Sequence, residues 1–312
     1  MTTTTTAPAP GIAKVETSAV ETSGRDNRAG WLFSAPFLIL YGLFLVGPVL
    51  VGLVISFFNT ATVKNDLGEF VAFENYTAVL GNVDFWKSMW HSTLFTLLTV
   101  PFLVVLPLVA AVLASRISRN RWFFRIAFFA PYVVPSASVA LIFAFLYAPQ
   151  IGLFAQGFDA VGLTAPDFLG STNGAWLAVT ILTVWWTFGF NFVLYTAALQ
   201  DIPEDTYEAA AIDGTSAWQQ MRSITVPLLR PTIGLVLLLQ ILASLKVFDQ
   251  IFILLQGGPN LTTRPVIQYI YDTGFTTYRG GYAAAATMVY FLILVAISAV
   301  WMFATRRRGA DA

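Results

Sequence analysis

The stretch YEAAAIDGTSAWQQMRSITVP, Tyr207–Pro227, is a short polar segment between two long apolar runs. Just before it, Pro203 is followed by Glu204 and Asp205. This pattern predicts the start of a helix, because proline fits the first turn and acidic side chains complement the positive end of the helix dipole. Gly214 predicts the end of that helix, since glycine readily adopts the backbone conformation that follows a helix C-terminus.

A second helix is predicted directly after the glycine. Ser216 with Gln219 three residues later fits a capping box, and Pro227 is expected to close the helix that this box opens. The segment therefore predicts a helical hairpin. Such a hairpin either caps a bundle of membrane helices or offers its alanine-rich face to another protein.

The composition points to a membrane protein. Hydrophobic residues make up 57% of the 312 residues, charged residues only 11%, and the mean hydropathy is +0.70. Soluble domains average about 25% charged residues. The net charge of zero gives no field that would attract nucleic acid, and the absence of cysteine excludes thiolate chemistry. Asp201, Glu204, Asp205 and Glu208 form a cluster of acids, but acids are ordinary in the first turn of a helix, so no metal site is expected.

A membrane span needs about 20 apolar residues, and the uncharged runs predict six such helices. They are expected near residues 31–57, 92–115, 124–148, 175–199, 232–255 and 282–304. The fold class predicted is all-α, a polytopic membrane protein with six transmembrane helices and a helix pair between the fourth and fifth. The predicted divisions are a disordered tail (1–28), a transmembrane domain (29–305) with the helix-pair loop at 200–230, and a basic C-terminus (306–312).

The distribution of Lys and Arg predicts the orientation. Twelve lie on the side of the two termini and the hairpin: Lys14, Arg25, Arg28, Arg116, Arg119, Arg121, Arg125, Arg222, Arg230, Arg306, Arg307 and Arg308. Four lie on the other side: Lys64, Lys87, Arg264 and Arg279. Positive residues concentrate in cytoplasmic loops, so both termini and the hairpin are expected in the cytoplasm of a cell-membrane protein.

The spacing within the hairpin resembles the cytoplasmic signature of the permease subunits of ABC importers. That signature is Glu-Ala-Ala, three residues, Gly, nine residues, Ile, any residue, Leu and Pro. The chain has Glu208, Ala209 and Ala210, then Gly214, Ile224 and Pro227, with Val226 in place of the leucine. The stretches APYVVPS (130–136), KVFDQIFIL (246–254) and GGP (257–259) are similar to the maltose-permease-like branch, and the resemblance covers roughly residues 31–305.

The resemblance implies a set of partners and a role for the hairpin. The partners would be a second permease subunit in a heterodimer, two cytoplasmic ATPase subunits, an external solute-binding protein and the lipid bilayer. The hairpin would seat in the ATPase through Glu208, Ala209, Ala210, Asp213, Gly214, Ile224 and Pro227. The chain has no phosphate-binding loop of the G-x-x-x-x-G-K type. It is therefore expected to be no enzyme and to bind no cofactor, while ATP and Mg²⁺ are used by the partner ATPase.

Polar and aromatic residues near the middle of two predicted spans are candidates for a sugar path. Aromatic faces suit the C–H surfaces of sugars, and amides and hydroxyls suit their hydroxyl groups. The candidates are Thr183, Trp186, Thr187, Phe190, Asn191, Gln240, Ser244, Lys246 and Asp249. Tryptophans there could equally fill gaps between helices. Lys246 and Asp249, three apart, would share one helical face and either border the path or form a structural ion pair.

The function that these features predict is ATP-driven import of a sugar, a di- or oligosaccharide, delivered by an external binding protein. An ion-coupled secondary transporter is the alternative, although its usual paired repeats are not visible. A polytopic membrane enzyme would need a clustered catalytic site, and the chain has one histidine.

Overall fold

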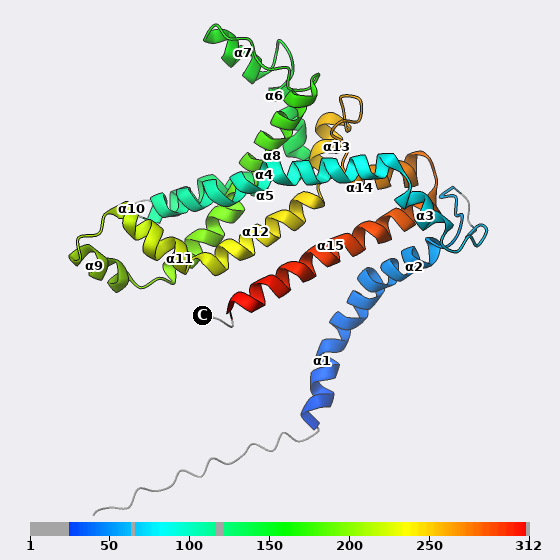
Figure 1. Ribbon diagram of the computed structural model, residues 1–312, viewed down its shortest axis with the longest axis horizontal. Coiled ribbons are helices and arrows are strands. Elements are labelled where there is room, and N and C mark those ends of the chain that lie inside the picture. The colour runs from blue at the N-terminus through cyan, green and yellow to red at the C-terminus, as the bar shows by residue number, and fades with distance from the viewer. Residues whose placement is uncertain (1–24, 64–65, 116–120, 310–312) are drawn as a thin grey trace, which may run out of the picture. The chain divides into compact units, whose positions relative to one another are not determined.

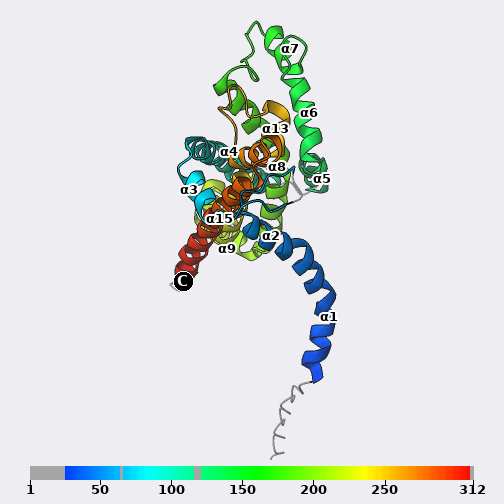
Figure 2. The same cartoon turned by 90° about the vertical axis from the view of Figure 1, so that its right-hand side faces the viewer.

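The computed structural model describes residues 25–63, 66–115 and 121–309, which are almost entirely helical (Figures 1 and 2). Within these ranges, paired extended backbone is confined to two isolated bridges, Phe58 with Phe70 and Ala61 with Arg279. The predicted all-α class is confirmed. Residues 1–24 of the predicted tail and 310–312 of the predicted basic C-terminus lie outside the described ranges. The chain divides into two compact units, 1–51 and 52–312.

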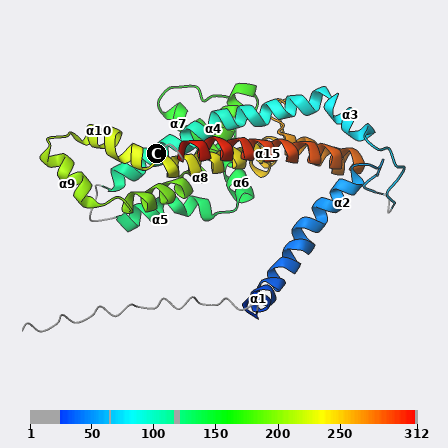
Figure 3. The same ribbon diagram turned by 60° about the horizontal axis from the view of Figure 1, so that its bottom comes forward.

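The described residues of the first unit, 25–51, form one long helix (Figure 3). It consists of α1 (Arg25–Tyr41), the π-helical turn η1 (Gly42–Val46) and the beginning of α2 (Gly47–Ile55). Gly30–Ile55 is long and apolar enough to cross a membrane, and none of its most apolar window is buried in protein. A helix that is apolar on all sides suits lipid. The π-turn ends at Val46, two residues before Pro48, whose missing N–H interrupts regular α-helical bonding.

Three helices of the second unit are also long and apolar enough to span a membrane. They are α4 (Val83–Ser115), α8 (Thr172–Gln200) and α15 (Gly280–Gly309). The described residues thus hold four such helices, or six if each of two bent helix pairs counts as one span. Shorter helices connect them: α3 (Glu74–Leu80), α7 (Leu153–Ala160), α14 (Val266–Tyr271) and the π-turn η3 (Asp272–Thr276).

The third predicted span is not one helix. It consists of α5 (Arg121–Val133) and α6 (Ser136–Leu146), which are bent by 93° relative to each other. The prediction of a single helix over 124–148 was wrong because Pro135 cannot continue a helix and acts as the N-cap of α6. The break frees the carbonyl of Val134, which accepts a hydrogen bond from Trp186 Nε1 at 3.0 Å.

The fifth predicted span, 232–255, is also interrupted. Here α12 (Arg230–Leu245) ends before Lys246, and a separate helix α13 (Asp249–Leu255) begins three residues later. The expectation that Lys246 and Asp249 share one helical face was therefore wrong, and no ion pair joins them. The side chains of Lys246 and Asp249 are both exposed at this break. The freed carbonyl of Leu245 accepts a hydrogen bond from the hydroxyl of Tyr290 in α15.

A buried amide bridge joins the centres of α4, α8 and α12. Pro107 in α4 has no N–H, so the carbonyl of Leu103 four residues earlier lacks its usual helical donor. Asn191 Nδ2 donates to that carbonyl at 2.8 Å, and Gln240 Nε2 donates to Asn191 Oδ1 at 2.9 Å. Asn191 and Gln240 are both buried. One asparagine thus satisfies a proline defect and fixes three helices together.

We expect Asn191→Leu to lower the free energy of unfolding by about 1–2 kcal/mol, because it leaves the Leu103 carbonyl and the Gln240 amide without partners. The measurement is the unfolding transition of the purified protein in mixed micelles. Thr196→Val on the same helix is the control, since the Thr196 hydroxyl bonds only the Phe192 carbonyl of its own helix. Gln240→Leu should lower the free energy of unfolding less when it is added to Asn191→Leu than when it is made alone. Additive losses would contradict the bridge.

Candidate functional site

The polar segment between α8 and α12 folds as the predicted hairpin. Its first helix, α9 (Glu204–Ile212), follows Pro203 as N-cap, and Gly214 has φ +77°. Its second helix starts with α10 (Ala217–Gln220), and the predicted capping box is present, with Ser216 and Gln219 bonded reciprocally. A Cβ at Gly214 would meet nothing within 4 Å, so the backbone conformation itself is what demands glycine.

The second helix ends at Leu228, one residue beyond the predicted Pro227. It passes from α10 through a π-turn, η2 (Met221–Thr225), into α11 (Val226–Leu228), and Pro227 lies in the first turn of α11. The π-turn tolerates the missing N–H, as it does before Pro48. After Leu229 the chain turns by 67° and enters α12 at Arg230.

Side-chain hydrogen bonds hold the two arms of the hairpin together. The hydroxyls of Tyr207 and Thr225 lie 3.0 Å apart, with Thr225 buried. Near the tip, Thr215 Oγ1 donates to the Ala210 carbonyl at 2.6 Å, and Gln220 Nε2 donates to Thr215 at 3.3 Å. The hairpin is therefore a defined structural unit and not a loose loop.

The tip of the hairpin is exposed and carries apolar side chains. Ile212 and Trp218, on either side of Gly214, are 87% and 65% exposed. The tip thus presents two large apolar side chains in an otherwise polar hairpin. Sequence reasoning missed both residues, although two apolar residues flanking the glycine of an otherwise polar hairpin are a visible signal.

The predicted hairpin residues divide between tip and base. Glu208, Ala209, Asp213 and Gly214 are exposed, whereas Ala210, Ile224 and Pro227 are half-buried. Ile224 and Pro227 lie on the arm that leads into α12. The predicted hairpin residues on α9 and the turn are therefore mostly accessible, whereas those on η2 and α11 are partly covered by the protein.

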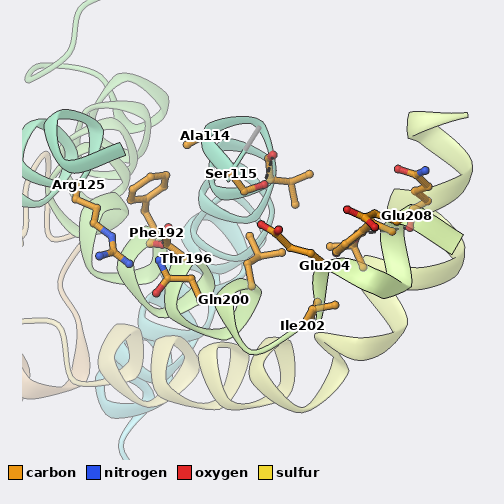
Figure 4. A pocket seen from close by; sticks show the side chains of 14 residues that line it. Ala114, Ser115, Arg125, Phe192, Thr196, Gln200, Ile202, Glu204 and Glu208 are labelled. Atoms are coloured by element: carbon orange, nitrogen blue, oxygen red, sulfur yellow. Dashed lines mark hydrogen bonds between the residues drawn. The ribbon is translucent and has the colours of Figure 1, made fainter. Parts of the chain in front are cut away.

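A cavity of about 730 Å³ lies behind the hairpin (Figure 4). Its walls come from the ends of α4 and α8, the start of α5, and the hairpin helices. Arg125 lies on one wall, with Glu204 and Glu208 on the other (Figure 4). Arg125 Nε is buried without a hydrogen-bond partner among the described residues, and no ion pair there crosses the cavity. Among all residues that the structure describes, no three His, Asp or Glu side chains are grouped so that they could hold a metal ion.

Most polar residues of the predicted sugar path are buried and bonded within the protein. Thr183 donates to the Val179 carbonyl at 2.7 Å and faces Gln250 of α13 at 3.4 Å. Ser244 lies 3.4 Å from Thr99 of α4, and Thr187 is 9% exposed. Together with the Asn191–Gln240 bridge, these contacts tie α4, α8, α12 and α13 to one another.

The aromatic candidates on α8 pack against α5. Tyr132 stacks with Phe190 at a ring distance of 5.1 Å and tilts against Trp186 at 5.6 Å. Because the Trp186 indole also donates to Val134, it supports the bend between α5 and α6. Lys246 and Asp249 are exposed at the α12–α13 break, where Ser136 Oγ donates to Asp249 at 2.7 Å.

An all-helical, multi-pass chain with a structured hairpin between two spans has the architecture of a membrane transport component. The chain matches the family described as binding-protein-dependent transport system inner membrane component over residues 67–309, and it belongs to this family. Like its relatives, it is a permease subunit, and it is not an enzyme.

Several relatives match nearly the whole chain. The sulfoquinovosyl glycerol transport system permease protein of Agrobacterium fabrum is 31% identical over 89% of this chain and 90% of its own length. The multiple sugar-binding transport system permease protein of Streptococcus mutans is 32% identical over 86% and 92%. The trehalose/maltose transport system permease protein of Thermococcus litoralis is 30% identical over 91% and 96%.

A solved structure shares the fold. It is the crystal structure of a bacterial ABC transporter that imports the acidic polysaccharide alginate, and one of its chains superimposes with a TM-score of 0.79 at 24% identity. The match covers 91% of this chain and 98% of that one. The likeness establishes the permease fold for this chain.

We expect Gly214→Val to weaken the hairpin, because a β-branched residue cannot easily adopt φ +77°. Gly214→Asn is the matched control, since asparagine tolerates this conformation. The measurement is the amount of ATPase that co-purifies with the permease. We expect less ATPase with Gly214→Val and a near-normal amount with Gly214→Asn, at equal permease yield. Equal retention by both variants would contradict the role of this turn.

Proposed function

We propose that this chain moves a sugar through the membrane as one half of an ATP-driven importer. The observation that carries the proposal is the hairpin, a fixed helical unit with an exposed apolar tip placed between α8 and α12. Energy released by a partner at the tip would reach the spans that carry the candidate path residues. The named relatives, at 30% identity or more, support sugar as the substrate.

The substrate proposed is a di- or oligosaccharide. The name of one relative specifies trehalose and maltose, which are disaccharides, and that of another specifies a sulfoquinovosyl glycerol, a single sugar ring joined to glycerol. The path would run along α8 and α12 by way of Thr183, Trp186, Thr187, Phe190, Asn191, Gln240 and Ser244, with Lys246 and Asp249 toward one end. Because Asn191 and Gln240 bond each other, and Thr183 and Ser244 bond other buried groups, opening the path would require these side chains to exchange partners.

The partners proposed are a second permease subunit, two ATPase subunits and an external solute-binding protein. The family description supports the binding protein. The exposed Ile212 and Trp218 with Glu208 beside them support a protein contact at the hairpin tip. This chain would bind no cofactor, and ATP with Mg²⁺ would act on the ATPase subunits.

The orientation proposed places the hairpin and both termini in the cytoplasm, on the strength of the Lys and Arg distribution. Reporter fusions that truncate the chain at Gly174 and Arg308 test it. The Gly174 fusion should be active outside the cell and the Arg308 fusion inside. An external reporter at Arg308 would overturn the orientation.

The transport test uses the assembled complex in proteoliposomes with enclosed ATP. Labelled glucose, maltose, maltotriose and lactose are supplied with the external binding protein. We expect uptake of at least one sugar to require both ATP and the binding protein, and to persist when ionophores collapse proton and sodium gradients. Uptake by this chain without an ATPase, driven by an ion gradient, would instead establish the secondary-transporter alternative.

A further inference from the structure

The connection between α13 and α14, residues 256–265, has a backbone that its own residues do not favour. We call this connection the α13–α14 link. Gln256 has φ +50° and Leu261 has φ +60°. Residues other than glycine adopt this conformation at a cost, which bonds and contacts around them must offset. The shape of the link therefore depends on what holds it.

Two consecutive residues of α4 hold the end of the link (the helices are labelled in Figure 1). His91 Nδ1 lies 3.1 Å from the carbonyl oxygen of Arg264, and the Val266 N–H donates to Ser92 Oγ at 3.0 Å. Pro265 between them has no N–H, so this carbonyl and this N–H are the polar backbone groups on either side of it. With one hydrogen bond to each, α4 fixes the link where it enters α14.

The bond from His91 requires a proton on Nδ1. A carbonyl oxygen only accepts, so the imidazole must donate to Arg264 through its Nδ1–H group. One neutral tautomer and the charged imidazolium both carry this proton. A second proton, on Nε2, therefore changes the charge of the ring without removing the bond.

A positive charge on His91 is unfavourable where the ring lies. The ring is half-buried and packs against Trp176 of α8 at a centroid distance of 6.1 Å. Among the described residues, the cations that repel a charge on this ring are Arg264 and Lys87. The acids that partly neutralise these cations are Asp272, 3.9 Å from Arg264, and Asp84, 3.6 Å from Lys87. Burial and like charge thus both disfavour the charged ring while the link is packed against α4.

We propose that His91 is a proton-operated clamp on the α13–α14 link, closed when the ring is neutral and weakened when the ring is charged. Because the packed link disfavours the charged ring, opening of the link takes up a proton, and a lower pH therefore favours opening. His91 is the only histidine in the sequence, and histidine ordinarily changes charge between about pH 5 and 8. Opening would loosen the hold of α4 on the link and, through the link, on the end of α13.

The experiment measures hydrogen exchange of the peptide that contains residues 256–266, in the full chain in mixed micelles at about pH 8 and about pH 6. His91→Asn is the test variant, because its amide can donate as Nδ1–H does but does not titrate. The peptide has the same sequence in both proteins, so its intrinsic exchange rate cancels at each pH. We expect nearly equal rates at the higher pH, and exchange about fivefold faster in wild type at the lower pH.

Ser92→Ala is the matched control, since it removes the neighbouring bond to Val266 without changing a group that titrates between these pH values. It should speed exchange of the link by a similar factor at both pH values. Equal exchange by wild type and His91→Asn at both pH values would overturn the clamp. A difference that is the same at both pH values would overturn its response to protons. If His91→Asn is not recovered folded, His91→Gln replaces it under the same criteria.

Discussion

The second unit depends on one constraint, which is that backbone carbonyls freed at breaks in apolar helices must find donors inside the protein. Water is absent from the hydrocarbon core, so an unsatisfied carbonyl there is costly. Three side chains meet this need: Asn191 for Leu103, Trp186 for Val134 and Tyr290 for Leu245. Each donor comes from a different helix than its acceptor. The defects that weaken individual helices therefore specify how the helices pack.

The sequence was sufficient for the parts of the fold that depend on local chemistry. The hairpin followed from Pro203, Gly214 and the Ser216–Gln219 capping box, because each acts within one helical turn. The long spans followed from uncharged length alone. Family membership followed from the spacing of Glu208, Gly214 and Pro227, and the comparisons confirmed it.

The breaks within the third and fifth spans could not be predicted because they depend on partners distant in sequence. A proline in an apolar segment can kink a helix, end it or be absorbed by a π-turn, as Pro135, Pro48 and Pro227 illustrate. The outcome depends on whether a donor such as Trp186 is available across the bundle. The same dependence makes Asn191 and Gln240 ambiguous from sequence, since a buried amide can serve a substrate or a backbone carbonyl.

The two arms of the hairpin join the membrane helices in different ways. The α9 arm follows α8 after Asp201, Ile202 and Pro203, and it lines the cavity together with the ends of α4 and α8. The η2–α11 arm passes through the buried Leu229 and a turn of 67° into α12. A displacement of this arm would therefore reach α12 through a bent junction. Because α12 ends at the break beside Lys246, a movement of α12 need not pass to α13 as it would along one continuous helix.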